Sequence, residues 1–127
     1  AFAEYAHHKV RTEFWGYAAK ESLDNEAFIK EEYQGIRPAP GYPSCPDHRL
    51  KNDIWDLLDV KKKINISLTE SLAMWPTASV SGLYFSHPQS RYFQLGRIDK
   101  DQVEVYSKER GESTDENERW LSPILGY

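Results

Sequence analysis

The stretch RPAPGYPSCPDH, residues 37–48, interrupts the regular structure that is predicted on either side of it. Its prolines lack a backbone N–H and push each preceding residue towards an extended conformation, so helix and regular sheet are excluded here. Backbone carbonyls in such a segment need water, a side chain or a ligand as hydrogen-bond partner. From the residues alone, two interpretations stay open: a loop that packs on the following helix, or a rigid surface that presents groups to a ligand.

Two helices are predicted before this stretch. Apolar residues at three- and four-residue steps predict a helix over 2–17 that ends near Gly16. Its expected apolar face consists of Phe2, Tyr5, Ala6, Val10, Phe14 and Tyr17. The same helix carries His7 and His8, which we expect at the surface or its rim. A second helix is expected from Asp24 or Asn25, both good caps, to Tyr33.

After the proline stretch, the sequence of residues 49–97 predicts one helix followed by strands. Asp47 is expected to cap a helix over 49–58, whose buried stripe consists of Leu50, Ile54, Leu57 and Leu58. Alternation from Ile64 to Leu68 predicts a strand. The β-rich segments 79–86 and 91–97 flank a turn at 87–90, which predicts a hairpin.

Two further helices are predicted at the end of the chain. Asp99 and Gln102 have the spacing of a capping box, in a helix that ends at Gly111. Ser113 and Glu116 have the same spacing, in a last helix that Pro123 stops. Helices, loop, strands and helices in this order indicate the α+β class, with helices packed around a small antiparallel sheet or hairpin.

Composition excludes several classes of protein. The 127 residues carry a net charge of −4 and show no basic patch, so we expect no binding to nucleic acid. The single cysteine excludes an internal disulfide and agrees with a reducing compartment. No apolar run reaches the roughly 18–20 residues of a membrane helix, and the expected location is the cytoplasm. The helical rhythm at the first residue leads us to expect that 1–127 is part of one domain cut from a larger multidomain protein.

No catalytic or metal-binding set is predicted. The sequence has no nucleotide-binding or hydrolase motif, and no arrangement that would activate a nucleophile. Cys45, Asp47 and His48 lie close together but are too few to make a convincing zinc site. Binding is the remaining chemistry: Arg37 can grip a carboxylate, and Tyr42, after Gly41, can project outwards to stack on a flat ligand.

Four segments carry a resemblance to a known family: RTEFWGYA (11–18), GIRPAPGYPSCPDH (35–48), MWPTASVSGLYFSHP (74–88) and ERWLSPILGY (118–127). Together they resemble the C-terminal S-adenosylmethionine-binding reactivation domain of cobalamin-dependent methionine synthase, nearly from end to end. The resemblance implies that 1–127 is the C-terminal portion of this activation domain. It also implies that preceding residues supply acidic groups to the ligand site.

The resemblance implies a function in reactivation of a methyltransferase. The family domain binds S-adenosylmethionine for the reductive methylation of cob(II)alamin, while a flavodoxin-type partner supplies an electron. Cobalamin would be held by the cobalamin-binding domain of the same chain, and zinc would lie elsewhere in the full enzyme. The segment alone is not expected to be catalytic. A stand-alone S-adenosylmethionine sensor and a structural interaction module are the alternatives.

Site residues follow from the resemblance position by position. The positions expected to contact S-adenosylmethionine are Arg37, Ala39, Tyr92 and Phe93. Phe93 stands where a tyrosine is also familiar, so a hydroxyl contact would be lost there. The positions expected to face the cobalamin are Gly41, Tyr42 and Pro43. Cys45 to His48 would only lead into the next helix.

Overall fold

The computed structural model describes all residues, 1–127, and they form two compact units. Unit 1 comprises Ala1–Pro38 and Gly82–Tyr92, and unit 2 comprises Ala39–Ser81 and Phe93–Tyr127. Six α-helices and one two-stranded antiparallel sheet confirm the α+β class. None of the helices is both long and apolar enough to cross a membrane.

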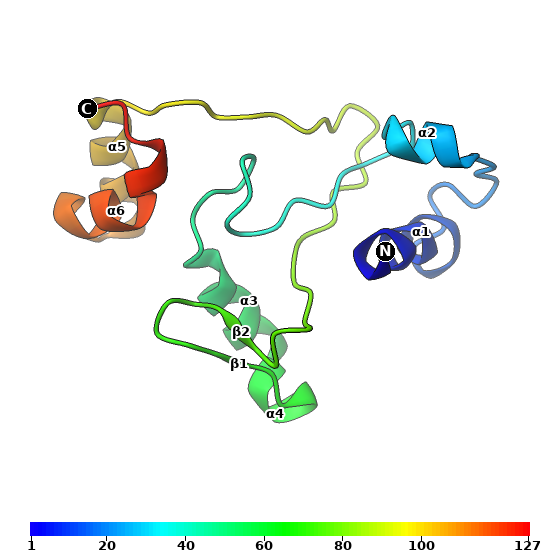
Figure 1. Cartoon of the computed structure of the whole chain (residues 1–127), viewed down its shortest axis with the longest axis horizontal. Helices are drawn as coiled ribbons and strands as arrows, with labels where there is room; N and C mark the ends of the chain where they lie inside the picture. Colours follow the sequence, from blue (N-terminus) through cyan, green and yellow to red (C-terminus); the bar gives the residue numbers. More distant parts are fainter. The chain divides into compact units, whose positions relative to one another are not determined.

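Unit 1 begins with α1, Phe2–Lys9, which continues into a π-helical turn, Val10–Phe14, and then α2, Asn25–Ile29, follows (Figure 1). Asp24 caps α2 as predicted, because its carboxylate accepts the N–H of Ala27 at 2.9 Å. This helix is shorter than the predicted one, since Glu31 already has a left-handed backbone conformation with φ of 57°.

The predicted apolar face of the first helix is only partly buried. Val10 is buried as expected, but Phe2, Tyr5 and Phe14 are exposed. His7 and Arg11, which lie outside that face, are buried instead. Burial of the Arg11 charge is possible because both oxygens of the Glu21 carboxylate accept its N–H groups, each at 2.7 Å. The ion pair of Arg11 and Glu21 is therefore buried, although the periodicity of the helix predicted that aromatic rings would be.

A short antiparallel contact within unit 1 replaces the predicted hairpin. Ile36 and Phe85 exchange two backbone hydrogen bonds, of 2.9 and 3.0 Å, and Leu83 donates to the carbonyl of Pro38 at 2.9 Å. The turn at 87–90 is present, with Ser90 donating to the carbonyl of His87. The hairpin of 79–86 with 91–97 was nevertheless wrong, because the backbone of Leu83 and Phe85 pairs with the start of the proline stretch instead.

Unit 2 contains α3, Leu50–Leu58, and α4, Val60–Ile64, followed by β1, Ser67–Leu68, and β2, Met74–Trp75 (Figure 1). The two strands pair antiparallel, with Ser67 opposite Trp75. The predicted strand 64–68 thus starts three residues later than expected. The predicted buried stripe of α3 was wrong too, because Leu57 is 84% exposed while Lys51 is buried.

The chain ends with α5, Lys100–Arg110, and α6, Thr114–Leu121, then a 3₁₀ turn, Ser122–Ile124. Figure 1 shows α5 and α6 packed side by side, as their contacts require. The capping box of Asp99 and Gln102 is confirmed, and Ser113 caps α6 by accepting the N–H of Glu116 at 3.2 Å. Val103 and Leu121 contribute apolar core to this unit.

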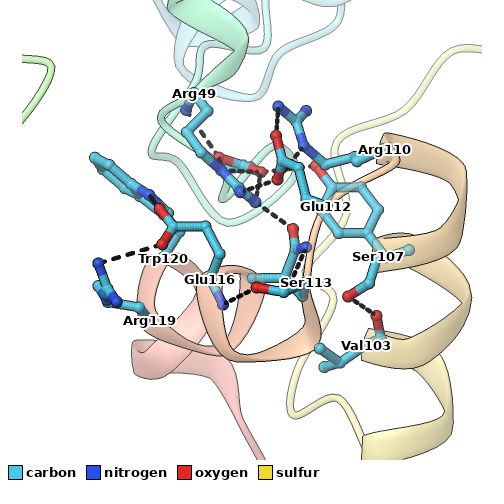
Figure 2. Close-up of polar contacts among 12 residues, drawn as sticks. Arg49, Val103, Ser107, Arg110, Glu112, Ser113, Glu116, Arg119 and Trp120 are labelled. Atoms are coloured by element: carbon cyan, nitrogen blue, oxygen red, sulfur yellow. Dashed lines mark hydrogen bonds and ion pairs between the residues drawn. The ribbon is translucent and has the colours of Figure 1, made fainter.

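A buried polar cluster joins the end of the proline stretch to α5 and α6 (Figure 2). We call Asp47, Arg49, Tyr106, Glu112 and Asn117 the Arg49 cluster. The Arg49 guanidinium donates to Asp47 at 2.7 Å and to Asn117 at 2.6 Å, and it also binds Glu112. Tyr106 donates to Asp47 at 2.7 Å.

The expected role of Asp47 as cap of α3 was wrong. Its carboxylate accepts the backbone N–H of Arg49, which precedes the helix, and the guanidinium of the same residue. Burial alone raises the pKa of Asp47, but the hydrogen bonds from Arg49 and Tyr106 more than offset this effect, and the pKa lies below its usual value. Asp47 is therefore the anionic centre of the Arg49 cluster.

Candidate functional site

Arg37 lies in unit 1 with both its backbone and its guanidinium fixed. Its backbone N–H donates to the hydroxyl of Tyr92 at 2.9 Å, so two of the predicted site residues are in direct contact. Nη1 of the guanidinium donates to the hydroxyl of Tyr33 at 2.8 Å and lies 3.3 Å from Nδ1 of His7. Nη2 is 3.8 Å from a carboxylate oxygen of Glu4, beyond hydrogen-bond distance. The side chain is 22% exposed, so the cation stays accessible.

His7 is the most enclosed member of this group, with no exposed surface. Its ring stacks on Tyr84 and meets the ring of Tyr33 edge-on, each at 5.2 Å between centroids. Burial, with the nearby cations of Arg11 and Arg37, lowers the pKa of His7 to about 4. The imidazole is therefore neutral at physiological pH, and the expectation of a surface histidine was wrong.

The buried imidazole predicts how unfolding depends on pH. Unfolded His7 titrates near pH 6.5 and folded His7 near 4, so the unfolded state binds more protons in this window and stability falls as the pH is lowered through it. We expect His7 to contribute up to about 3 kcal/mol of this loss. The free energy of unfolding, measured in urea, should therefore fall less steeply between pH 6.5 and 4 for His7→Asn than for the parent. Equal dependence on pH in the two proteins would contradict the prediction.

The ring of Tyr33 contacts the guanidinium groups of both Arg11 and Arg37. The ring lies 4.5 Å from the Arg11 guanidinium and 5.3 Å from that of Arg37, both within cation–π range. Burial raises the pKa of Tyr33, so the hydroxyl keeps its proton while it accepts from Arg37. Arg37 is thus held by two neutral groups, and its charge remains uncompensated apart from the distant Glu4 carboxylate.

The corner Gly41–Pro43 lies in unit 2 and forms a tight turn. Tyr42 donates its N–H to the carbonyl of Ala39 at 3.2 Å, and Gly41 at the third position has a φ of 96°, as a type II turn requires. Two more backbone bonds of 2.8 Å join Gly41 and Tyr42 to Cys45. The turn projects Tyr42, which is 65% exposed, as predicted.

The ring of His48 packs against the corner Gly41–Pro43. A Cβ at Gly41 would lie 2.1 Å from Cε1 of the His48 ring, so the ring packs directly against the glycine. Lys51 donates to the carbonyl of Leu72 at 2.7 Å and lies 3.0 Å from Nδ1 of His48. Burial lowers the pKa of both side chains, and the Lys51 charge lowers that of His48 further. Residues 45–48 therefore do more than lead into α3.

An apolar pocket of about 340 Å³ opens beside the corner, within unit 2. Gly41, Tyr42 and Pro43 line it together, so the three positions predicted to face cobalamin share one surface. Trp120 and Leu121 of α6 line another part of it. The pocket is suited to a flat, largely apolar ligand surface.

The remaining predicted positions lie in unit 2. Ala39 supplies the carbonyl that closes the type II turn, and Phe93 is 54% exposed, as an accessible ring should be. Sequence reasoning missed Tyr33 and His7 as neighbours of Arg37. Tyr33 and Arg37 are four residues apart but outside any helix, and the contact between His7 and Arg37 crosses 30 residues of sequence, so no local pattern indicated either contact.

Comparison with known proteins gives matches to a family model and to solved structures. The family model described as "Vitamin B12 dependent methionine synthase, activation domain" matches residues 1–111. A crystal structure of the MetH reactivation domain bound to AdoHcy is 60% identical in sequence, with a TM-score of 0.91. The alignment covers 99% of this chain and 39% of that one, so the chain spans well under half the length of the structure it matches.

Proposed function

The chain belongs to the vitamin B12-dependent methionine synthase activation domain family, and from this premise we propose that it binds S-adenosylmethionine for the reactivation of the methyltransferase. The environment of the Arg37 side chain is the observation that best supports the proposal. Arg37 is a fixed and accessible cation whose anchors are neutral, which suits the carboxylate of an amino-acid ligand. The related reactivation domain is bound to AdoHcy, a ligand that carries the same amino-acid group.

We infer the contacts of S-adenosylmethionine from these residues. Arg37 binds the carboxylate, and Tyr92, which already holds the Arg37 backbone, lies beside the ligand. Ala39 offers backbone polar groups, and the ring of Phe93 offers an apolar surface without a hydroxyl. The chain contributes binding and orientation and supplies no nucleophile, so it is not catalytic alone.

We propose that the corner Gly41–Pro43 faces the corrin. The fit is supported by the exposed ring of Tyr42 and by the apolar pocket that the three residues line. Cobalamin would supply the cobalt that receives the methyl group of S-adenosylmethionine once one electron is donated, with S-adenosylhomocysteine as the leaving group, and Gly41–Pro43 would lie against it. In this proposal the cobalamin-binding domain of the same chain holds it, a flavodoxin-type protein donates the electron, and any zinc lies outside residues 1–127. The cytoplasm, where the free Cys45 would stay reduced, is the proposed location.

Replacing Arg37 tests the proposal. Arg37→Ala in the intact protein should weaken S-adenosylmethionine binding by about 100-fold, since a partly buried charge-assisted contact is lost. Isothermal titration calorimetry measures the change. Arg91→Ala is the matched control, because this arginine belongs to the same unit and donates only to the carbonyls of Pro88 and Ser90. Equal affinity of the Arg37→Ala variant and the parent would refute the carboxylate contact.

A further inference from the structure

The Nη1 atom of Arg37 has hydrogen-bond partners within unit 1 for both of its N–H groups. Nη1 carries two N–H groups, and its two neighbours at hydrogen-bond distance are the Tyr33 hydroxyl, at 2.8 Å, and Nδ1 of His7, at 3.3 Å. Nε and Nη2 make no hydrogen bond within the unit, and Nη2 has only the longer contact to Glu4. The side of the guanidinium formed by Nε and Nη2 is therefore the one available for a bidentate carboxylate.

The hydrogen-bond directions assign one tautomer to His7. A guanidinium only donates, so Nδ1 must accept, and the proton of the neutral ring is on Nε2. Nε2 lies 3.4 Å from the hydroxyl of Tyr17, which in turn lies 3.4 Å from the carbonyl of Gln34 and can donate to it. The hydrogen bonds thus form a chain in which Arg37 donates to His7, His7 donates to Tyr17, and Tyr17 donates to the backbone carbonyl of Gln34.

Packing and the contact with Arg37 together keep the His7 ring in this orientation. The ring is wholly buried, stacks on Tyr84 at an interplanar angle of 23° and meets Tyr33 at 82°. A 180° flip about the Cβ–Cγ bond would keep both ring contacts but would place a carbon where Nδ1 now lies, so the contact with Arg37 selects this orientation. A neutral ring is also required here, because the guanidinium groups of Arg11 and Arg37 both lie near it and would repel an imidazolium.

We propose that His7 is a positioning residue, which with Tyr33 fixes the Arg37 guanidinium so that Nε and Nη2 meet the carboxylate of S-adenosylmethionine. The inference rests on the proposed function. His7 itself does not contact the ligand in this proposal. It lowers the entropy that Arg37 would otherwise lose on binding, so its effect is expressed only through the ligand's carboxylate.

The test compares two ligands that differ only in this group, S-adenosylmethionine and its decarboxylated analogue, in titrations of the intact protein. His7→Leu keeps an apolar side chain but removes the acceptor, and we expect about tenfold weaker binding of S-adenosylmethionine with the analogue unchanged within twofold. His7→Asn places an amide oxygen near the position of Nδ1 and should restore most of the affinity. Equal weakening of both ligands in His7→Leu, or no weakening of either, would overturn the proposal.

Two further variants keep the result decisive. If His7→Leu does not fold, Tyr33→Phe keeps the ring and removes the second acceptor of Nη1, and it should weaken binding of S-adenosylmethionine more than binding of the analogue. Arg37→Ala separates this inference from the proposed function. If Arg37→Ala discriminates between the ligands and the His7 and Tyr33 variants do not, positioning by His7 is wrong and the Arg37 contact stands. If Arg37→Ala does not discriminate either, the proposed carboxylate contact is wrong, and the positioning role with it.

Discussion

Arg49→Ala is expected to lower the free energy of unfolding by about 3–5 kcal/mol, because it leaves a buried carboxylate without its cation. The Arg49 side chain is 6% exposed and that of Asp47 5%, so water cannot replace the lost contacts. Asn117, which has no exposed surface, would lose its bond from Nη2 as well. Urea denaturation measures the change.

A second arginine beside the Arg49 cluster provides the control. Arg119 pairs with Glu116 on α6, but its side chain is 74% exposed (Figure 2). Arg119→Ala should therefore cost less than about 1 kcal/mol. Replacing Asp47 and Arg49 together by Asn and Met should cost less than Arg49→Ala alone, since no unpaired charge then remains buried. Similar losses for the Arg49 and Arg119 variants would show that the buried pair does not stabilise unit 2.

Gly41→Ala is expected to destabilise the corner by about 2–6 kcal/mol, as the sum of backbone strain and overlap. The φ of 96° is unfavourable for any residue with a Cβ, and that Cβ would lie 2.1 Å from the His48 ring. The ring cannot move freely, because Lys51 holds its Nδ1 and is itself bound to the carbonyl of Leu72. The variant should lose stability in urea and weaken reactivation in the intact protein.

The contributions of strain and overlap can be separated. Gly96 also has a left-handed conformation, with φ of 69°, but a Cβ there would meet nothing within 4 Å. Gly96→Ala should therefore cost only the strain, about 1 kcal/mol. Combining Gly41→Ala with His48→Ala should recover the part due to overlap, measured as a coupling energy in a double-mutant cycle. Additive losses would mean that the His48 ring does not support the corner.

Local signals in the sequence were sufficient for three of the four predicted caps, with Asp47 as the exception, and for two turns. Asp24, Ser113 and the pair Asp99–Gln102 lie where their short-range hydrogen bonds require. The turn at 87–90 and the projecting Tyr42 also follow from neighbouring residues alone. These features were predictable because each depends on groups only a few residues apart.

Burial and strand pairing were not predictable in this way. Periodicity assigns the inside of a helix to apolar residues, but Arg11 and Lys51 are buried there by contacts to Glu21 and to the carbonyl of Leu72, which follow 10 and 21 residues later. The pairing of Leu83 and Phe85 with residues 36–38 depends likewise on a distant segment rather than on the adjacent turn. The same limitation hid the contact of His7 with Arg37, whereas Arg37 itself was identified through the family resemblance.

The bond between Arg49 and Asn117 also bears on the order in which the protein is made. It joins residues 68 positions apart, so the ribosome must deliver α6 before Arg49 has its full set of partners. Until then the segment leading into α3 carries a charged pair, Asp47 and Arg49, that water still solvates. The pocket beside the corner, which Trp120 and Leu121 of α6 also line, is therefore completed only after α6 has emerged.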